Sequence, residues 1–93
     1  MKEVVALFRV ECPKLMQQIR SAITAENPSE LQLAAHTLKG SIQFFGVKRP
    51  AEAAQALETL GRHNTLDRAE EAWSVLVKEI EQFMPLLTDL TRS

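Results

Sequence analysis

His36 is the side chain best suited to chemistry in this chain, because of the residues that follow it. Lys39 comes three positions later and Gly40 four, so on a helix all three lie on one part of the surface. Near pH 7 a useful fraction of imidazole is neutral and nucleophilic, and a lysine one turn away offers a cation to an anion on the ring. Such a set suits phosphoryl transfer, which depends mainly on positioning and charge stabilisation.

Gly40 is the least expected member of this set, since glycine inside a helix costs about 1 kcal/mol relative to alanine. A helical wheel places it nearly opposite the apolar stripe of its helix, and His36 about 140° from the centre of that stripe. Bare backbone there would let a partner approach His36 closely. An exposed histidine alone is usually only solvated, so the lysine and glycine carry the interpretation. The exposed face around His36 is expected to hold Gln32, Lys39, Gly40 and Gln43.

The helix that carries His36 is predicted from the periodicity of its apolar residues. Asn27 can cap its N-terminus, Pro28 fits the first turn, and the pattern continues to about Phe45. Elsewhere too, apolar residues recur at steps of three and four, and no stretch alternates as a strand does. The predicted buried stripe of this helix consists of Leu31, Ala35, Leu38, Ile42 and Phe45.

Prolines interrupt two other helical patterns. Residues 3–26 contain Pro13, which removes a helix hydrogen bond and crowds the preceding turn. We therefore expect a short helix before Pro13, followed by a kink or by a restart with the proline in the first turn. Pro85 falls near the end of the last pattern, where we expect the final turns to bend or be displaced.

The remaining helices complete the predicted fold. A third helix opens at Pro50 and ends near Gly61, and a fourth follows a cap at Asn64 or Thr65. Short connections between long amphipathic helices favour antiparallel neighbours. The predicted class is therefore all-α, an antiparallel four-helix bundle with a short extra helix at the N-terminus.

Composition limits the function classes. The 93 residues allow one domain, and a net charge of −1 argues against non-specific binding to nucleic acid or anionic lipid. The longest apolar run, residues 4–8, is too short to span a bilayer, and no secretory signal is visible, so a cytoplasmic location is expected. Cys12 is the only cysteine, which fits a reducing compartment and a packing role.

Other polar and aromatic candidates have simpler explanations. His63, in a predicted turn, lacks the lysine and glycine context, so we expect it to be solvated. The two histidines and the cysteine form no pair at metal-ligand spacing, so no metal site is predicted. Trp73 lies on an apolar stripe and is expected to pack in the core. The acidic residues that begin the fourth helix suit its dipole and a solvated face: Asp67, Glu70 and Glu71.

The segment Ala35–Ser41, with the sequence AHTLKGS, is followed by Phe45-Gly46 and resembles the signature of histidine-containing phosphotransfer (Hpt) domains. The resemblance covers essentially the whole chain. It implies that His36 accepts a phosphoryl group from an aspartyl phosphate on a receiver domain and passes it to another receiver. It also implies that Lys39 neutralises the phosphoryl charge and that Gly40 lets the receiver dock. The resemblance also implies that the chain has no kinase catalysis of its own. It implies no bound cofactor either, since the receiver is expected to bring the magnesium ion.

Two further residues gain candidate roles from the resemblance. Family members often have Glu or Gln near the position of Glu58, where it orients the histidine ring; the alternative is a solvated glutamate. Phe44 departs from the small or polar residues common after the motif, and falls on the exposed side beyond Gly40. It would be an apolar docking contact for a receiver, or else pack under the turn at 46–50. The expected docking residues are Gln32, Gly40, Gln43 and Phe44.

Three functions remain open at this stage. The first is a relay domain over residues 1–93, free-standing or part of a larger hybrid sensor kinase, with receiver domains and a kinase as partners. The second is a helical docking module that carries no phosphate, or a bundle with a chance motif, which the intact Lys39 and Gly40 disfavour. The third is the phosphorylated N-terminal domain of a chemotaxis-type histidine kinase, although Leu38 and Ser41 are more similar to the relay type.

Overall fold

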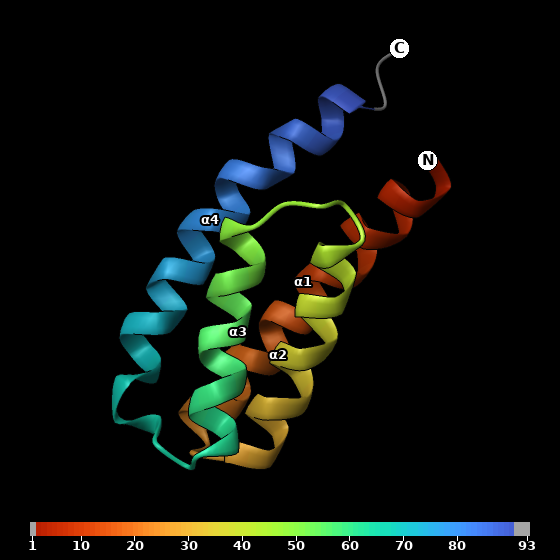
Figure 1. Cartoon of the computed structure of the whole chain (residues 1–93). Helices are drawn as coiled ribbons and strands as arrows, with labels where there is room; N and C mark the ends of the chain where they lie inside the picture. The colour runs from red at the N-terminus through yellow and green to blue at the C-terminus, as the bar shows by residue number, and fades with distance from the viewer. Residues whose placement is uncertain (1, 91–93) are drawn as a thin grey trace.

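Four α-helices and one 3₁₀ turn make up the computed structural model, which describes residues 2–90. They are α1 (Lys2–Thr24), α2 (Pro28–Gln43), α3 (Arg49–Arg62), the 3₁₀ turn η1 (Leu66–Arg68) and α4 (Ala69–Leu90). The helices lie side by side, and the chain reverses direction at each connection (Figure 1). The all-α prediction is confirmed, and four packed helices are consistent with a four-helix bundle. Within residues 2–90, no helix is long and apolar enough to cross a membrane.

The prediction of a separate short helix at the N-terminus is wrong, because α1 continues through Pro13 without a break. The proline ring is on the exposed side of the helix. Buried residues lie both before and after it, and burying one such aliphatic or aromatic side chain is worth about 1.5–3 kcal/mol, so several outweigh the proline cost of about 3 kcal/mol. The buried side of α1 consists of Val5, Phe8, Cys12, Leu15, Ile19, Ala22 and Ile23.

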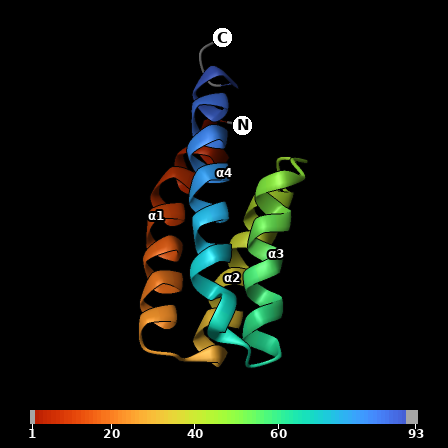
Figure 2. The same ribbon diagram turned by 90° about the vertical axis from the view of Figure 1, so that its left-hand side faces the viewer.

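Pro85 does not end α4 either. The helix includes this proline and continues to Leu90, with the proline exposed and Leu87, two residues later, fully buried. Figure 2 shows α4 as one continuous column in front of α2, between α1 and α3. A proline on the solvent side of a long amphipathic helix removes one hydrogen bond but no core contact, which explains both continuous helices.

The predicted buried stripe of α2 is largely confirmed, with two differences. Ala34 is buried as well, because α2 packs against both α1 and α3 and therefore needs a wider apolar arc. Phe45 is only half-buried and follows the end of α2. Its ring meets Phe8 of α1 edge-on at a centroid distance of 5.3 Å, and Phe83 of α4 at 5.7 Å. This aromatic cluster joins α1, α4 and the segment that follows α2, at the end of the molecule where α2 ends.

The other end of the molecule is held by a polar contact between α1 and α4. Arg20 donates two hydrogen bonds to the carboxylate of Glu70, at 2.8 and 2.6 Å, and its guanidinium lies 5.8 Å from the centroid of the Trp73 ring. Trp73 is half-buried against the core, in line with the packing role expected for it. Glu70, expected on a solvated face, is exposed but paired.

The α2–α3 pair holds the residues of interest, and its local geometry follows from two sequence features. The Asn27 side chain accepts from the backbone N–H of Glu30 at 3.2 Å, which confirms the predicted N-cap of α2. Gly61 of α3 sits against the first turns of α2. A Cβ added there would lie 2.7 Å from the backbone nitrogen of Gln32 and 2.8 Å from the carbonyl oxygen of Pro28. Only glycine allows this approach of the two backbones.

We expect Gly61→Ala to destabilise the fold by about 1–3 kcal/mol, because the added methyl group meets two backbone atoms that cannot move aside cheaply. The gain in helix propensity, about 1 kcal/mol, offsets only part of this cost. Urea denaturation followed by circular dichroism measures the change. Gly40→Ala is the matched control, since a Cβ there has no atom within 4 Å. Equal stability of the parent and the Gly61 variant would show that the helices separate freely at this point.

Candidate functional site

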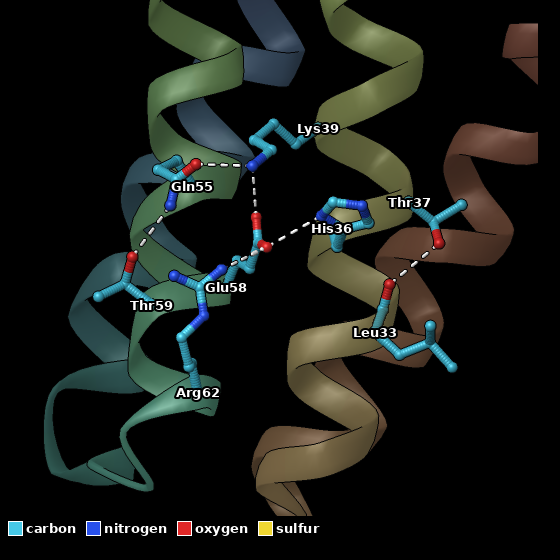
Figure 3. Close-up of polar contacts among 8 residues, drawn as sticks. All are labelled: Leu33, His36, Thr37, Lys39, Gln55, Glu58, Thr59 and Arg62. Carbon is cyan, nitrogen blue, oxygen red and sulfur yellow. Dashed lines mark hydrogen bonds and ion pairs between the residues drawn. The ribbon is translucent and has the colours of Figure 1, made fainter.

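His36 stands on the outer surface of α2, and its side chain is 64 % exposed. Its Nδ1 atom lies 2.9 Å from Oε2 of Glu58, which comes from α3 (Figure 3). An ionised carboxylate can only accept a hydrogen bond, so Nδ1 carries the proton and donates it. In the neutral ring the lone pair is therefore on Nε2, the nitrogen on the side away from Glu58. This arrangement presents a nucleophilic nitrogen with a fixed tautomer on an exposed side chain.

Glu58 is buried, with only 2 % of its surface exposed, and three side chains converge on it. Besides His36, the Nζ of Lys39 lies 2.6 Å from Oε1, and the Nη2 of Arg62 donates to Oε2 at 2.9 Å (Figure 3). Burial raises the pKa of Glu58, but the hydrogen bonds and charges of Lys39 and His36 outweigh it and hold that pKa below its ordinary value. The carboxylate is therefore ionised at neutral pH, as an acceptor for Nδ1 must be.

Lys39 was expected on the exposed face around His36, but its side chain is only 15 % exposed and points toward α3. Its ammonium donates to Oε1 of Gln55 at 2.7 Å, in addition to the ion pair with Glu58. Gln55 in turn donates through Nε2 to Oγ1 of Thr59 at 3.1 Å. The buried charge of Glu58 accounts for this direction, since an unpaired buried carboxylate would be strongly unfavourable.

The predicted exposed face around His36 is correct for Gly40 and Gln43, which are exposed, but not for Gln32. Gln32 is half-buried because its turn of α2 packs against Gly61. At Gly40 nothing within the described residues lies within 4 Å of an added Cβ. No contact among the described residues therefore explains this glycine, which leaves bare backbone on the surface one turn from the imidazole.

An apolar groove, which we call the α1–α2 groove, begins beside Gly40. Phe44 forms part of its wall with a ring that is 62 % exposed and meets Phe45 edge-on at 5.4 Å, so it is not packed under the turn at 46–50. Leu7 of α1, 61 % exposed, lies on the opposite wall. The residues that line the groove are Val4, Leu7, Phe8, Glu11, Thr37, Gly40, Ser41, Phe44 and Phe45.

Three residues around Glu58 were not identified from the sequence, namely Gln55, Thr59 and Arg62. Their spacing contains a signal, since positions 55, 58, 59 and 62 share one face of a helix. The contribution of α1 to the groove was also missed, because the N-terminal segment was expected to form a separate short helix.

The remaining candidates do not join the site. Cys12 is buried in the core, and burial raises the pKa of its thiol to about 11, so it is an unreactive packing residue. His63 is exposed at the C-cap of α3. Across residues 2–90, no group of three or more His, Cys, Asp or Glu side chains is arranged to hold a metal ion.

Comparison with known protein families gives one match. The family model described as Hpt domain matches residues 3–84, which include α1, α2, α3 and most of α4. Comparisons with curated proteins and with solved structures found no significant match. The matched range contains His36, Lys39, Gly40 and Glu58, so the family assignment and the geometry concern the same part of the molecule.

The lowered pKa of Glu58 predicts a pH-dependent stability. A carboxyl group whose pKa is lower in the folded than in the unfolded protein stabilises the fold at pH values above its unfolded pKa, here 4.5. The contribution is lost as the pH falls through the folded pKa. We therefore expect Glu58→Gln to lose about 1–3 kcal/mol at pH 7 and to show a shallower decline in unfolding free energy below pH 4.5 than the parent.

Urea denaturation at a series of pH values measures both effects. Glu70, whose pKa is also lowered by Arg20, keeps part of the acid dependence in both proteins. Glu70→Gln is the control for an exposed pair and should cost less at pH 7. Parallel stability curves for the parent and Glu58→Gln would contradict the charged state assigned to Glu58.

Proposed function

The chain belongs to the Hpt domain family, whose members are phosphocarriers in two-component signalling and interact with receiver domains, and from this we propose a phosphorelay intermediate. In this proposal His36 accepts a phosphoryl group from the aspartyl phosphate of one receiver and passes it to the aspartate of another. The single observation that supports it most is the ring of His36, exposed and held at Nδ1 by the buried Glu58. The proposal includes an antiparallel arrangement of the four helices, which the alternating directions in Figure 1 support.

The proposed step uses the lone pair of Nε2. It attacks phosphorus, a bond between nitrogen and phosphorus forms, and the bond between phosphorus and the aspartyl oxygen breaks, so that the aspartate leaves as a carboxylate. Nδ1 keeps its proton throughout the step, and this N–H remains hydrogen-bonded to Glu58. With both nitrogens substituted the ring is cationic, and the adjacent carboxylate stabilises it. The reverse reaction with a second receiver restores the neutral ring.

The partner is expected to supply what this chain lacks. We propose that the receiver brings the magnesium ion and the acidic residues that bind it, and that this chain binds no cofactor. Lys39 is the proposed charge partner of the phosphoryl group, because its Nζ is held within one turn of His36 on a flexible stem. A cytoplasmic location, with a histidine kinase upstream and no nucleic acid or membrane partner, remains part of the proposal.

The proposed docking surface consists of Gly40 and the α1–α2 groove, with Gln43 and the half-buried Gln32 beside His36. An exposed apolar wall next to a reactive side chain is typical of a protein-binding surface rather than of a solvated helix. Phe44 and Leu7 provide the largest apolar area of this wall. No observation favours a docking module without transfer or a kinase domain, whereas the bond from Nδ1 to Glu58 supports transfer.

The direct test incubates the protein with a phosphorylated receiver and follows acid-labile label on this chain. We expect label on the parent and none on His36→Gln, which removes the nucleophilic nitrogen but keeps a polar side chain of similar reach. His63→Gln is the matched control and should be labelled like the parent. Equal labelling of the parent and the His36 variant would refute the assignment. Receiver binding without label on the parent would support the docking module instead.

Gly40→Ala separates docking from chemistry. We expect the variant to be more stable than the parent by up to about 1 kcal/mol, because alanine is the better helix former and its methyl group meets nothing within the molecule. Transfer from the receiver should fall, by about tenfold if the added methyl group costs the complex about 1.4 kcal/mol. Labelling by the small donor phosphoramidate should be unchanged. Unchanged transfer from the receiver would show that close approach at Gly40 is not needed.

A further inference from the structure

The ammonium of Lys39, the proposed charge partner of the phosphoryl group, is already bound to side chains of α3. The two acceptors are Oε1 of Glu58 at 2.6 Å and Oε1 of Gln55 at 2.7 Å. Gln55 is oriented for this contact, since its amide nitrogen donates to Thr59. Nε2 of His36 is on the side of the ring away from Glu58, whereas the ammonium lies at Glu58 (Figure 3). To neutralise a phosphoryl group on Nε2, the ammonium must therefore leave Glu58. That departure removes a cation from a carboxylate that is 2 % exposed.

The two oxygens of Glu58 divide its partners in a way that makes the departure feasible. Within the part of the chain that the structure describes, Lys39 is the one charged partner of Oε1, whereas His36 and Arg62 both contact Oε2, each at 2.9 Å (Figure 3). Release of Lys39 therefore affects one oxygen and leaves the contacts of the other in place. Arg62 reaches Glu58 from the next turn of the same helix, so its contact does not depend on the spacing between α2 and α3.

The net charge of the site also favours the release of Lys39 from Glu58 when Arg62 is present. At rest the site contains one anion, Glu58, and two cations, Lys39 and Arg62, so its net charge is +1 when His36 is neutral. Transfer adds a doubly charged phosphoryl group and makes the ring a cation, which brings the total to zero. Without Arg62 the phosphorylated site would have a net charge of −1, and Lys39 would be shared between two anions. Gln55 cannot replace Arg62, because an amide carries no charge.

Resting on the proposed function, we infer that Arg62 is a positioning residue of the transfer site. It holds Oε2 of Glu58 and so supplies the second cation that lets Lys39 leave Oε1 for the phosphoryl group on His36. Its guanidinium is half-exposed, so it can stay on Glu58 without being desolvated further. Arg62 acts through Glu58 and Lys39 and does not contact the reacting nitrogen.

The experiment labels His36 with phosphoramidate, which needs no docking, and measures the phosphorylated fraction and its half-life by phosphorus NMR. We expect Arg62→Gln to reduce the half-life roughly threefold to tenfold. Arg62→Lys keeps the charge and should retain most of the parent behaviour. Arg68→Gln is the matched control, an exposed arginine of the η1 turn that makes the same change in net charge. Denaturation curves check that all variants are folded.

A second arm tests coupling, which a merely structural role would not produce. In a Lys39→Met background no lysine is left to release, so adding Arg62→Gln should shorten the half-life no further. Additive effects of the two substitutions, or a parent-like Arg62→Gln, would overturn the inference. Failure of the proposed function is distinguishable, because then the parent itself would carry no label on His36.

Discussion

A charged carboxylate buried between α2 and α3 is the constraint on which the site depends. Taking Glu58 out of water is costly unless its charge is matched, and three basic side chains from two helices surround it. The contact with Oε2 also selects Nδ1 of His36 as the protonated nitrogen and leaves the lone pair on Nε2. One set of polar contacts thus balances the buried charge and fixes the tautomer of the ring.

Two glycines in helices show how packing and function can be told apart. Gly61 is explained inside the molecule, because a Cβ there would be 2.7 Å from a backbone atom of α2. This close approach brings α3 near enough for Glu58 to reach His36. Gly40 has no such explanation, since its Cβ would meet nothing within 4 Å. A glycine that costs helix stability without a contact to explain it fits the proposed approach of a partner at this surface.

Helix periodicity and caps were enough to predict the helices around the site, and the spacing of residues 36, 39 and 40 was enough to select His36 as the candidate nucleophile. The errors came from rules applied one residue at a time. Pro13 does not break α1, because core contacts on both sides of it were not part of the local rule. The direction of Lys39 depends on a buried charge from another helix, which no helical wheel contains. Glu58 was a candidate only through the family resemblance, and Arg62 becomes visible only when its spacing from Glu58 is considered.

The surroundings of His36 differ on its two sides, and this separates recognition from chemistry. Toward α3 lie the polar side chains that fix the ring and balance charge, as Figure 3 shows. Toward α1 lies the apolar α1–α2 groove, whose lining residues do not include His36, Lys39 or Arg62, the polar partners of Glu58. Leu7 and Phe44 are exposed, so we expect substitutions there to leave the buried carboxylate and its partners in place. In the proposed function, the choice of receiver can therefore vary through the groove while the reactivity of Nε2 stays constant.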